Sequence, residues 1–166
     1  MKRHSVKVTR QCAHRGDNGQ CKRMTSVTHP YCAQHTKEHF GVSVKKSQIK
    51  GAGLGLFAER KFMADERIVE YTGEKLTTDQ YDRRYASDAL GSYGIQLSER
   101  YVIDAAKTTS GVARYACDYH GSGKKPNAEY VVFGSRIFIV ATRTIKPGDE
   151  IFTDYGDDMH RALGLN

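Results

Sequence analysis

The stretch that decides the fold is Glu150-Ile151-Phe152-Thr153-Asp154-Tyr155-Gly156, the end of a longer segment that begins at Tyr115. We expect this stretch to bring Tyr155 to a point where glycine and arginine segments from far upstream also meet. The chain is therefore interpreted as built around that tyrosine.

Length and composition favour one main domain. The chain has 166 residues, of which 39% are hydrophobic, enough for one compact core with a small appendage. No apolar run approaches the roughly 18 residues that span a bilayer, and residues 1–5 lack the apolar stretch of a secretory signal. We expect a soluble, intracellular protein without a membrane partner.

The net charge of +7 is unevenly distributed. Residues 1–50 hold 11 of the 26 Lys and Arg but only 2 of the 19 Asp and Glu, which leaves residues 51–166 slightly acidic. A basic segment favours contact with phosphate, as in nucleic acid, whereas an acidic remainder accepts a basic peptide. Charge alone favours the alternative of a merely solubilising basic face.

Three of the four cysteines lie in this basic third, and a histidine follows them in the order Cys-x8-Cys-x10-Cys-x2-His: Cys12, Cys21, Cys32 and His35. Zinc favours four such ligands in a tetrahedron, and the segment has few apolar residues with which to build a core. We predict a zinc-binding module over residues 1–40, followed by the main domain over residues 41–166.

Two alternatives to this zinc site remain open from the sequence. The thiols could form disulfides or stay reduced, but an odd number of cysteines and the lack of an export signal disfavour disulfides. The fourth ligand could also be His14, His29 or His39 in place of His35.

Alternation of apolar and polar residues predicts many short strands and little helix. The strands are expected at residues 42–44, 56–59, 68–71, 93–97, 101–105, 128–133 and 136–142. One helix is expected over residues 78–89 behind the capping box Thr77-Thr78-Asp79-Gln80, and a helical turn over residues 110–115. Gly134-Ser135 and Lys146-Pro147-Gly148-Asp149 have the residues of tight turns.

Six segments, in a fixed order between about Val44 and Gly156, carry a resemblance to a known family. They are Gly51-Ala52-Gly53-Leu54-Gly55-Leu56-Phe57, Glu70-Tyr71-Thr72-Gly73, Ile103-Asp104-Ala105, Ala113-Arg114-Tyr115, Lys125-Pro126-Asn127-Ala128 and Asp154-Tyr155-Gly156. In this order the chain resembles the SET-domain protein lysine methyltransferases. The resemblance implies a mainly β (α+β), β-clip-like fold of several small sheets. It also implies a knot-like C-terminal crossing, where the segment ending at Tyr155 meets the segment around Arg114.

The activity implied by the resemblance is transfer of a methyl group from S-adenosylmethionine to a lysine ε-amine in a tyrosine-lined channel. Tyr155 then resembles the catalytic tyrosine, Tyr71 orients the amine, and Tyr130 limits how many methyl groups fit. The implied donor-binding residues are Gly53, Leu54, Gly55, Tyr93, Arg114, Cys117 and Asp118. By the same analogy we expect a histone tail as substrate and a nuclear or chromatin-associated protein.

Two departures from the family pattern affect these expectations. Cys117 stands where many members have an asparagine whose amide helps to hold the donor, and a thiol is a poorer hydrogen-bonding partner. No cysteine-rich tail follows Gly156, so residues 157–166, the N-terminal module or a partner subunit must cover the channel. The alternative function is a catalytically weak, zinc-containing SET-like module that binds chromatin or nucleic acid.

Overall fold

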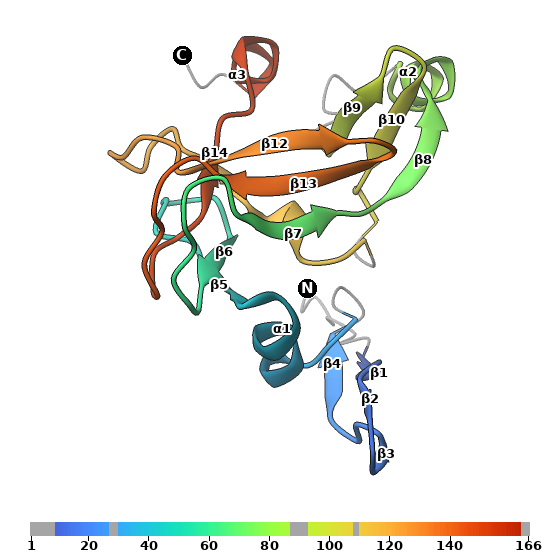
Figure 1. Ribbon diagram of the computed structural model, residues 1–166. Coiled ribbons are helices and arrows are strands. Elements are labelled where there is room, and N and C mark those ends of the chain that lie inside the picture. Colours follow the sequence, from blue (N-terminus) through green and yellow to red (C-terminus); the bar gives the residue numbers. More distant parts are fainter. Residues whose placement is uncertain (1–8, 27–29, 87–92, 108–109, 164–166) are drawn as a thin grey trace, which may run out of the picture.

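The chain forms several small β-sheets with short helices at their edges (Figure 1). The structure is a computed structural model and describes residues 9–26, 30–86, 93–107 and 110–163. Among these residues, none of the helices has the length and apolar character that crossing a bilayer requires. The mainly β architecture predicted from the sequence is confirmed.

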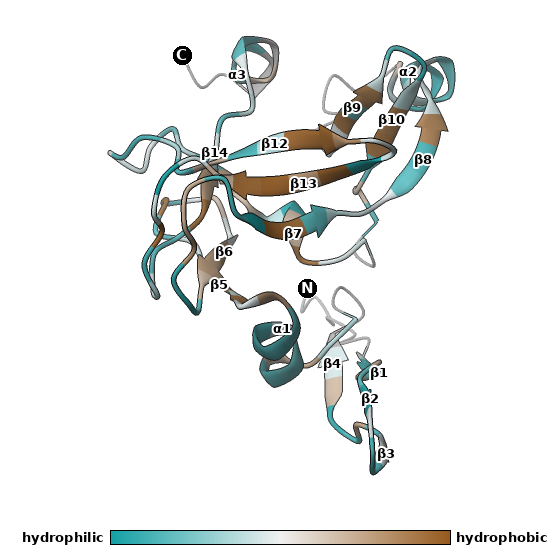
Figure 2. Ribbon diagram, viewed as in Figure 1, coloured by the Kyte–Doolittle hydropathy of each residue, from teal (hydrophilic) through white to brown (hydrophobic). Residues whose placement is uncertain are grey.

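The centre of the molecule is a three-stranded antiparallel sheet in the order β12-β13-β7, made of β7 (Arg67–Tyr71), β12 (Ala128–Phe133) and β13 (Arg136–Ala141). Strands β12 and β13 form the predicted hairpin, in which Phe133 faces Arg136 and Gly134 takes a φ of 61°. In Figure 2 these strands carry much of the hydrophobic colour, whereas α1 and α2 are hydrophilic. The core therefore lies on this sheet, with the fully buried Phe62, Ile137 and Ile139 among its members.

Two further sheets flank the centre. One has the order β8-β10-β9, with β8 (Glu74–Thr77), β9 (Gly94–Ser98) and β10 (Tyr101–Asp104). The other pairs β5 (Val42–Lys46) with β6 (Leu54–Ala58) in antiparallel register. All of these strands except β8 were predicted. The sequence Glu74-Lys75-Leu76-Thr77 has a single apolar residue and therefore shows no alternation of apolar and polar residues.

The segment that was expected to decide the fold forms a parallel pair. Strand β14 (Phe152–Thr153) runs beside β11 (Cys117–Asp118), with Cys117 opposite Phe152 and Asp118 opposite Thr153. Asn127 fixes the crossing, because its side chain donates to the carbonyl of Glu150 at 2.9 Å and accepts from the amide of Phe152 at 2.8 Å. The predicted meeting of the Tyr155 segment with the segment after Arg114 is confirmed.

Helix α2 (Thr78–Tyr85) begins at the predicted capping box, in which Thr77 and Gln80 exchange hydrogen bonds. It is shorter than the helix expected over residues 78–89, and residues 87–89 lie outside the described residues. The predicted helical turn is the 3-10 turn η1 (Ala113–Tyr115). The sequence reasoning missed α3 (Asp157–Leu163), a polar segment with no apolar repeat.

The N-terminal part lies to one side of the sheets, on the opposite side of the molecule from α3 (Figure 1). It holds β1 (Thr9–Gln11) paired with β4 (Met24–Ser26), β2 (Arg15–Gly16) paired with β3 (Gly19–Gln20), and α1 (Ala33–Phe40). Helix α1 ends at Gly41, whose φ of 66° lets the chain turn into β5. Residues 1–8 and His29, an alternative metal ligand, lie outside the described residues.

Candidate active site and metal cluster

Tyr155 leaves β14 with both its backbone and its hydroxyl fixed. Its amide donates to Asp118 Oδ2 at 2.8 Å, and its hydroxyl donates to the carbonyl of Ala116 at 2.8 Å. Both partners belong to the segment that includes β11. The parallel pairing of β11 and β14 thus determines where the phenol points, although the paired residues lie 35 positions apart in the sequence.

Tyr71 and Tyr130 lie together on two strands of the central sheet. Their rings meet edge to face with centroids 5.4 Å apart and an interplanar angle of 78°. The Tyr71 hydroxyl donates to the carbonyl of Tyr93 at 2.8 Å. The hydroxyl of Thr153 donates to that of Tyr130 at 3.4 Å, so the small side chain at Thr153 leaves room for the phenol of Tyr130.

These three tyrosines line one cavity of about 220 Å³. Its other lining residues are Tyr93, Gly94, Ile95, Gln96, Arg114, Asp154 and Met159. Burial raises the pKa of Tyr130 to about 12, and burial with nearby Tyr130 raises the pKa of Tyr71 and of Tyr155 still further. The phenols are therefore neutral at physiological pH and act as hydrogen-bonding groups rather than bases.

A second cavity, of about 320 Å³, adjoins the first and shares three lining residues with it: Tyr93, Arg114 and Tyr155. Ala52, Leu54, Tyr115, Ala116 and Cys117 complete its wall. A volume of this order suits a small organic molecule. Two separate pockets thus meet at the Tyr155 side chain.

Arg114 joins the walls of the two cavities. Its Nε donates to the carbonyl of Ala105 at 2.9 Å and its Nη2 to that of Ala106 at 3.3 Å. The guanidinium lies 4.3 Å from the ring centroid of Tyr93, within cation–π range. The side chain therefore ties η1 to the end of β10 and supports the partly exposed Tyr93.

Only some residues of the glycine segment, Gly51–Phe57, lie in the wall of the second cavity. Leu54 lines it, and Gly53 before it has a φ of 78°, which favours glycine. Gly55 is buried behind this wall, where a Cβ would collide with the carboxylate of Glu150. Gly55 is thus required by a packing contact, which the sequence reasoning missed because Glu150 lies 95 positions further on.

Glu150 is a buried carboxylate that holds the loop before the glycines. It is 1% exposed and accepts hydrogen bonds from the Ser47 hydroxyl at 2.6 Å and from the amide of Gln48 at 2.8 Å. In the sequence, the only sign of this contact is that Glu150 begins the segment Glu150–Gly156, which was expected to decide the fold.

Cys117 is buried in the wall of the second cavity. Its thiol lies 3.4 Å from the carbonyl of Leu54, to which it donates. Burial raises the pKa of Cys117 to about 11, so the thiol stays protonated. It can bridge β11 to the glycine segment, but it offers a ligand a weak hydrogen-bonding partner.

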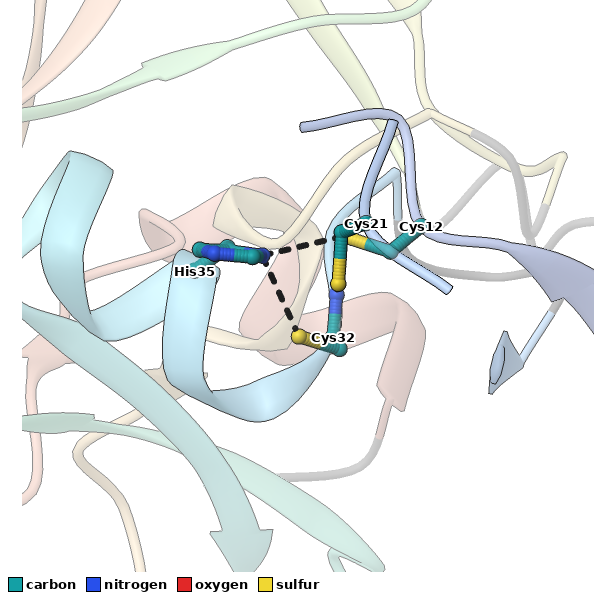
Figure 3. Close-up of side chains that lie close together, drawn as sticks. All are labelled: Cys12, Cys21, Cys32 and His35. Carbon is teal, nitrogen blue, oxygen red and sulfur yellow. Dashed lines mark hydrogen bonds between the residues drawn. The ribbon is translucent and has the colours of Figure 1, made fainter. Parts of the chain in front are cut away.

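The predicted metal ligands lie together, with Cys12 and Cys32 buried and Cys21 half-buried (Figure 3). His35 Nδ1 lies 3.3 Å from Cys12 Sγ and 3.4 Å from Cys32 Sγ. In a tetrahedral zinc site a sulfur and a nitrogen ligand are about 3.5 Å apart. The donor set and spacing therefore fit a zinc ion held by all four residues.

The same geometry favours His35 as the fourth ligand over the alternative histidines that are described. His14 stacks on His35 with ring centroids 3.7 Å apart, and its Nδ1 pairs with His39 Nε2 at 2.8 Å. The other ring nitrogen of His35 lies 3.5 Å from Glu38, as is usual behind a metal-binding histidine. Desolvation and the neighbouring His14 lower the pKa of His35, which favours the neutral, metal-binding imidazole.

Comparison with known proteins identifies the family. The SET domain family model matches residues 53–156. The chain is 39% identical over 107 residues to "Histone-lysine N-methyltransferase, H3 lysine-4 specific" of Emericella nidulans, which covers 61% of this chain and 8% of that protein. It is 31% identical over 127 residues to "N-lysine methyltransferase KMT5A-A" of Xenopus laevis, which covers 72% of this chain and 38% of that protein.

Solved structures agree with this similarity. "ctPRC2 in an autoinhibited conformation bound to S-adenosylmethionine" matches 75% of this chain and 16% of that chain, with a TM-score of 0.59 and 26% identity. "Apo ctPRC2 in an autoinhibited state" matches 70% of this chain and 15% of that chain, with a TM-score of 0.58 and 28% identity. This chain thus spans a minor part of each protein that it matches. The fold, the order of the motifs and the family match together establish that the chain belongs to the SET domain family.

Proposed function

We propose that the protein is an S-adenosylmethionine-dependent protein lysine N-methyltransferase. The observation that carries the proposal is the meeting of two cavities at Tyr155, one lined by tyrosines and the other by the glycine segment and β11. One pocket suits a lysine side chain and the other a methyl donor. Tyr155 lies between them, where a methyl group would pass.

The bound donor supplies a methyl group on a positively charged sulfur, which becomes a neutral thioether as the new N–C bond forms. The chain's own contribution is to orient the amine and to favour its neutral form. A lysine amine has an ordinary pKa of about 10.4, and desolvation among neutral phenols lowers it. The aromatic rings of Tyr71 and Tyr130 can pack along the lysine stem, while Tyr155 lines both pockets.

The donor pocket would use backbone from Gly53 and Leu54 together with the side chains of Tyr93 and Arg114. Gly55 and Asp118 act behind these groups, since each is buried and bonded to or packed on another part of the wall, whereas Cys117 lines the pocket and its thiol donates to the carbonyl of Leu54. Backbone contacts from β11 do not require the asparagine that Cys117 replaces. Such backbone contacts support S-adenosylmethionine as the donor despite this substitution.

A basic protein, in particular a histone tail, is the proposed substrate. Similar proteins are histone-lysine methyltransferases by name, and residues 51–166 carry a slight acidic excess. Asp154, whose side chain is half exposed, lines the tyrosine cavity and would attract a cationic lysine. A nuclear, chromatin-associated location follows from such a substrate.

The division into a zinc module over residues 1–40 and a SET domain over residues 41–166 is proposed on the same basis. Zinc is the proposed metal because three thiols and one imidazole suit it. The boundary coincides with the left-handed turn at Gly41. Contact of the basic N-terminal third with nucleic acid stays a prediction.

Methyl transfer from radiolabelled S-adenosylmethionine to core histones tests the proposal. We expect labelled histone with wild type and a loss of at least about 100-fold in rate with Tyr155→Phe, because the phenol that orients the reaction is removed. Donor binding, measured by calorimetry, should survive in the variant.

The alternative is a binding module without activity, and the observation that favours it is the thiol of Cys117 in the donor pocket. Such a module would transfer no label in either form and would bind the donor weakly. Wild-type labelling of histones would exclude it.

A further inference from the structure

Asp118 joins three parts of the site through one carboxylate. Its Oδ1 accepts from the amide of His120 at 2.9 Å and lies 2.5 Å from His120 Nδ1. Its Oδ2 accepts from the amide of Tyr155 at 2.8 Å and lies 2.8 Å from His160 Nε2, on α3. Burial opposes its charge, but these donors together lower the pKa of Asp118 and keep it ionised.

The alternative to a hydrogen-bonded cluster is a metal site, since one ligand atom from each of Asp118, His120 and His160 lies within 4.8 Å of the others. The distances disfavour it. Nitrogen and oxygen ligands of a tetrahedral zinc ion are about 3.3 Å apart, whereas the two separations here are 2.5 and 2.8 Å. A carboxylate has four lone-pair positions, and four donors already use them. The cluster is therefore a hydrogen-bonded one.

Helix α3 depends on this cluster for its position. A helix of seven residues is too short to be stable by itself. Among its described side chains, Asp157 and Arg161 are exposed, whereas His160 is only 6% exposed. The groups that face the His160 ring are Asp118, Asp154, His120 and Tyr119. The ring is thus an anchor of the helix.

Met159, which directly precedes His160 in the sequence, forms part of the tyrosine cavity. Met159 lines that cavity with Tyr71, Tyr130 and Tyr155, while none of the α3 side chains that the structure describes lines the second cavity. Displacement of the helix would therefore open the tyrosine channel and leave the donor pocket intact. The Asp118 carboxylate connects α3 to Tyr155, because it lies within hydrogen-bond distance of His160 on this helix and also accepts from the amide of Tyr155.

We propose that His160 is a positioning residue for methyl transfer: its hydrogen bond to Asp118 docks α3 and places Met159 as a wall of the lysine channel beside Tyr155. This inference rests on the proposed function. It assigns the cover of the channel to residues 157–163 rather than to the N-terminal module or a partner subunit.

Two variants and one control test the assignment in the full chain. His160→Ala removes the donor, His160→Gln restores an amide that can reach Asp118, and Asp157→Asn alters an exposed side chain of the same helix. Steady-state rates are measured with varied histone peptide and, separately, with varied S-adenosylmethionine. Hydrogen exchange of residues 157–163 and zinc content are measured on the same samples.

We expect His160→Ala to lower kcat/KM for the peptide by about tenfold or more, the usual effect of losing a hydrogen bond to a buried charged group. KM for S-adenosylmethionine should change less than about twofold, His160→Gln should recover most of the activity, and Asp157→Asn should resemble wild type. Exchange in α3 should be faster in His160→Ala than in wild type or His160→Gln, with zinc content unchanged.

Equal impairment of the alanine and glutamine variants would overturn the inference, as would a parallel rise in KM for the donor or a loss of zinc. If wild type transfers no methyl group, the proposed function fails, and hydrogen exchange alone then decides the docking role. Equal protection of α3 in wild type and His160→Ala would refute it.

Discussion

At the scale of single residues, the site consists of tyrosines whose neighbours fix their roles. Tyr155 and Tyr71 each donate to a backbone carbonyl, while Tyr130 accepts from Thr153. The first two phenols cannot rotate away without losing a partly buried hydrogen bond. The sequence pointed to Tyr71 and Tyr155 through their motifs and to Tyr130 through its position just after the segment that contains Asn127, but their partners come from segments far away in the chain.

Removal of the Tyr130 hydroxyl should change the product. In Tyr130→Phe the space beside Thr153 is freed, so we expect a shift toward higher methylation of the lysine, while the first methyl transfer changes by less than about tenfold. Mass spectrometry of a peptide after complete turnover measures the distribution. An unchanged ratio of mono-, di- and trimethyl products would refute the assignment of Tyr130.

The raised pKa of the channel tyrosines predicts a simple pH dependence. Since burial raises the pKa of Tyr130 to about 12 and those of Tyr71 and Tyr155 also upward, none ionises below about pH 10. The rate should therefore rise from pH 7 to 10 as the substrate amine loses its proton. A fall in kcat within this range that disappears in Tyr155→Phe would contradict the prediction.

At the scale of elements, Glu59, directly after β6, connects the N-terminal module to the SET domain. Its carboxylate pairs with Lys37 of α1 at 3.2 Å and with Lys45 of β5 at 2.6 Å, and it accepts from Ser43 at 2.5 Å. The amide of Glu59 also donates to the carbonyl of Gly41 at the boundary. The alternation of apolar and polar residues could predict β5 and β6. It could not predict the contacts of Glu59, which form only when both strands and α1 are in place.

This contact should weaken in acid. The hydrogen bond from Lys45, with that from Ser43, lowers the pKa of Glu59 from 4.5 to about 2. A depressed pKa in the folded state means that the carboxylate stabilises the fold above about pH 4.5, and that this contribution is lost as the pH falls toward 2.

Glu59→Gln keeps an acceptor for Ser43 but removes the charge. We expect it to lower the free energy of unfolding at pH 7 by about 1 kcal/mol, because the lysine partners are half exposed. The difference from wild type should shrink toward zero near pH 2. Denaturant unfolding of both proteins at several pH values measures it, and a difference that is constant with pH would exclude the charge as its cause.

At the scale of the whole molecule, two unequal parts rely on different sources of stability. The SET domain has a buried apolar core around β7, β12 and β13. The described part of residues 1–40 contributes only Cys12 and Cys32 to the buried hydrophobic residues. Metal coordination would supply the missing stability of this smaller part.

Chelation should therefore affect the two parts differently. Removal of zinc by a strong chelator, or Cys32→Ser, is expected to release one equivalent of zinc and to unfold residues 9–40, while the SET domain keeps its cooperative transition. Hydrogen exchange resolved by peptide measures both regions. Lys37→Ala, an exposed change on α1, is the matched control and should retain zinc. A preparation of reduced wild-type protein without zinc would refute the metal assignment.

The sequence by itself determined seven of the strands (β5, β6, β7, β9, β10, β12 and β13), the tight turns, the start of the capped helix, the cysteine and histidine spacing and the order of the family motifs. These features depend on contacts between neighbours in the chain, so a local pattern reveals them. Only the tertiary structure decided that β14 pairs with β11, that Gly55 makes room for Glu150, and that His160 reaches Asp118. Such contacts join residues 35 to 95 positions apart, and their free energy depends on the packing of the whole fold, which no local pattern records.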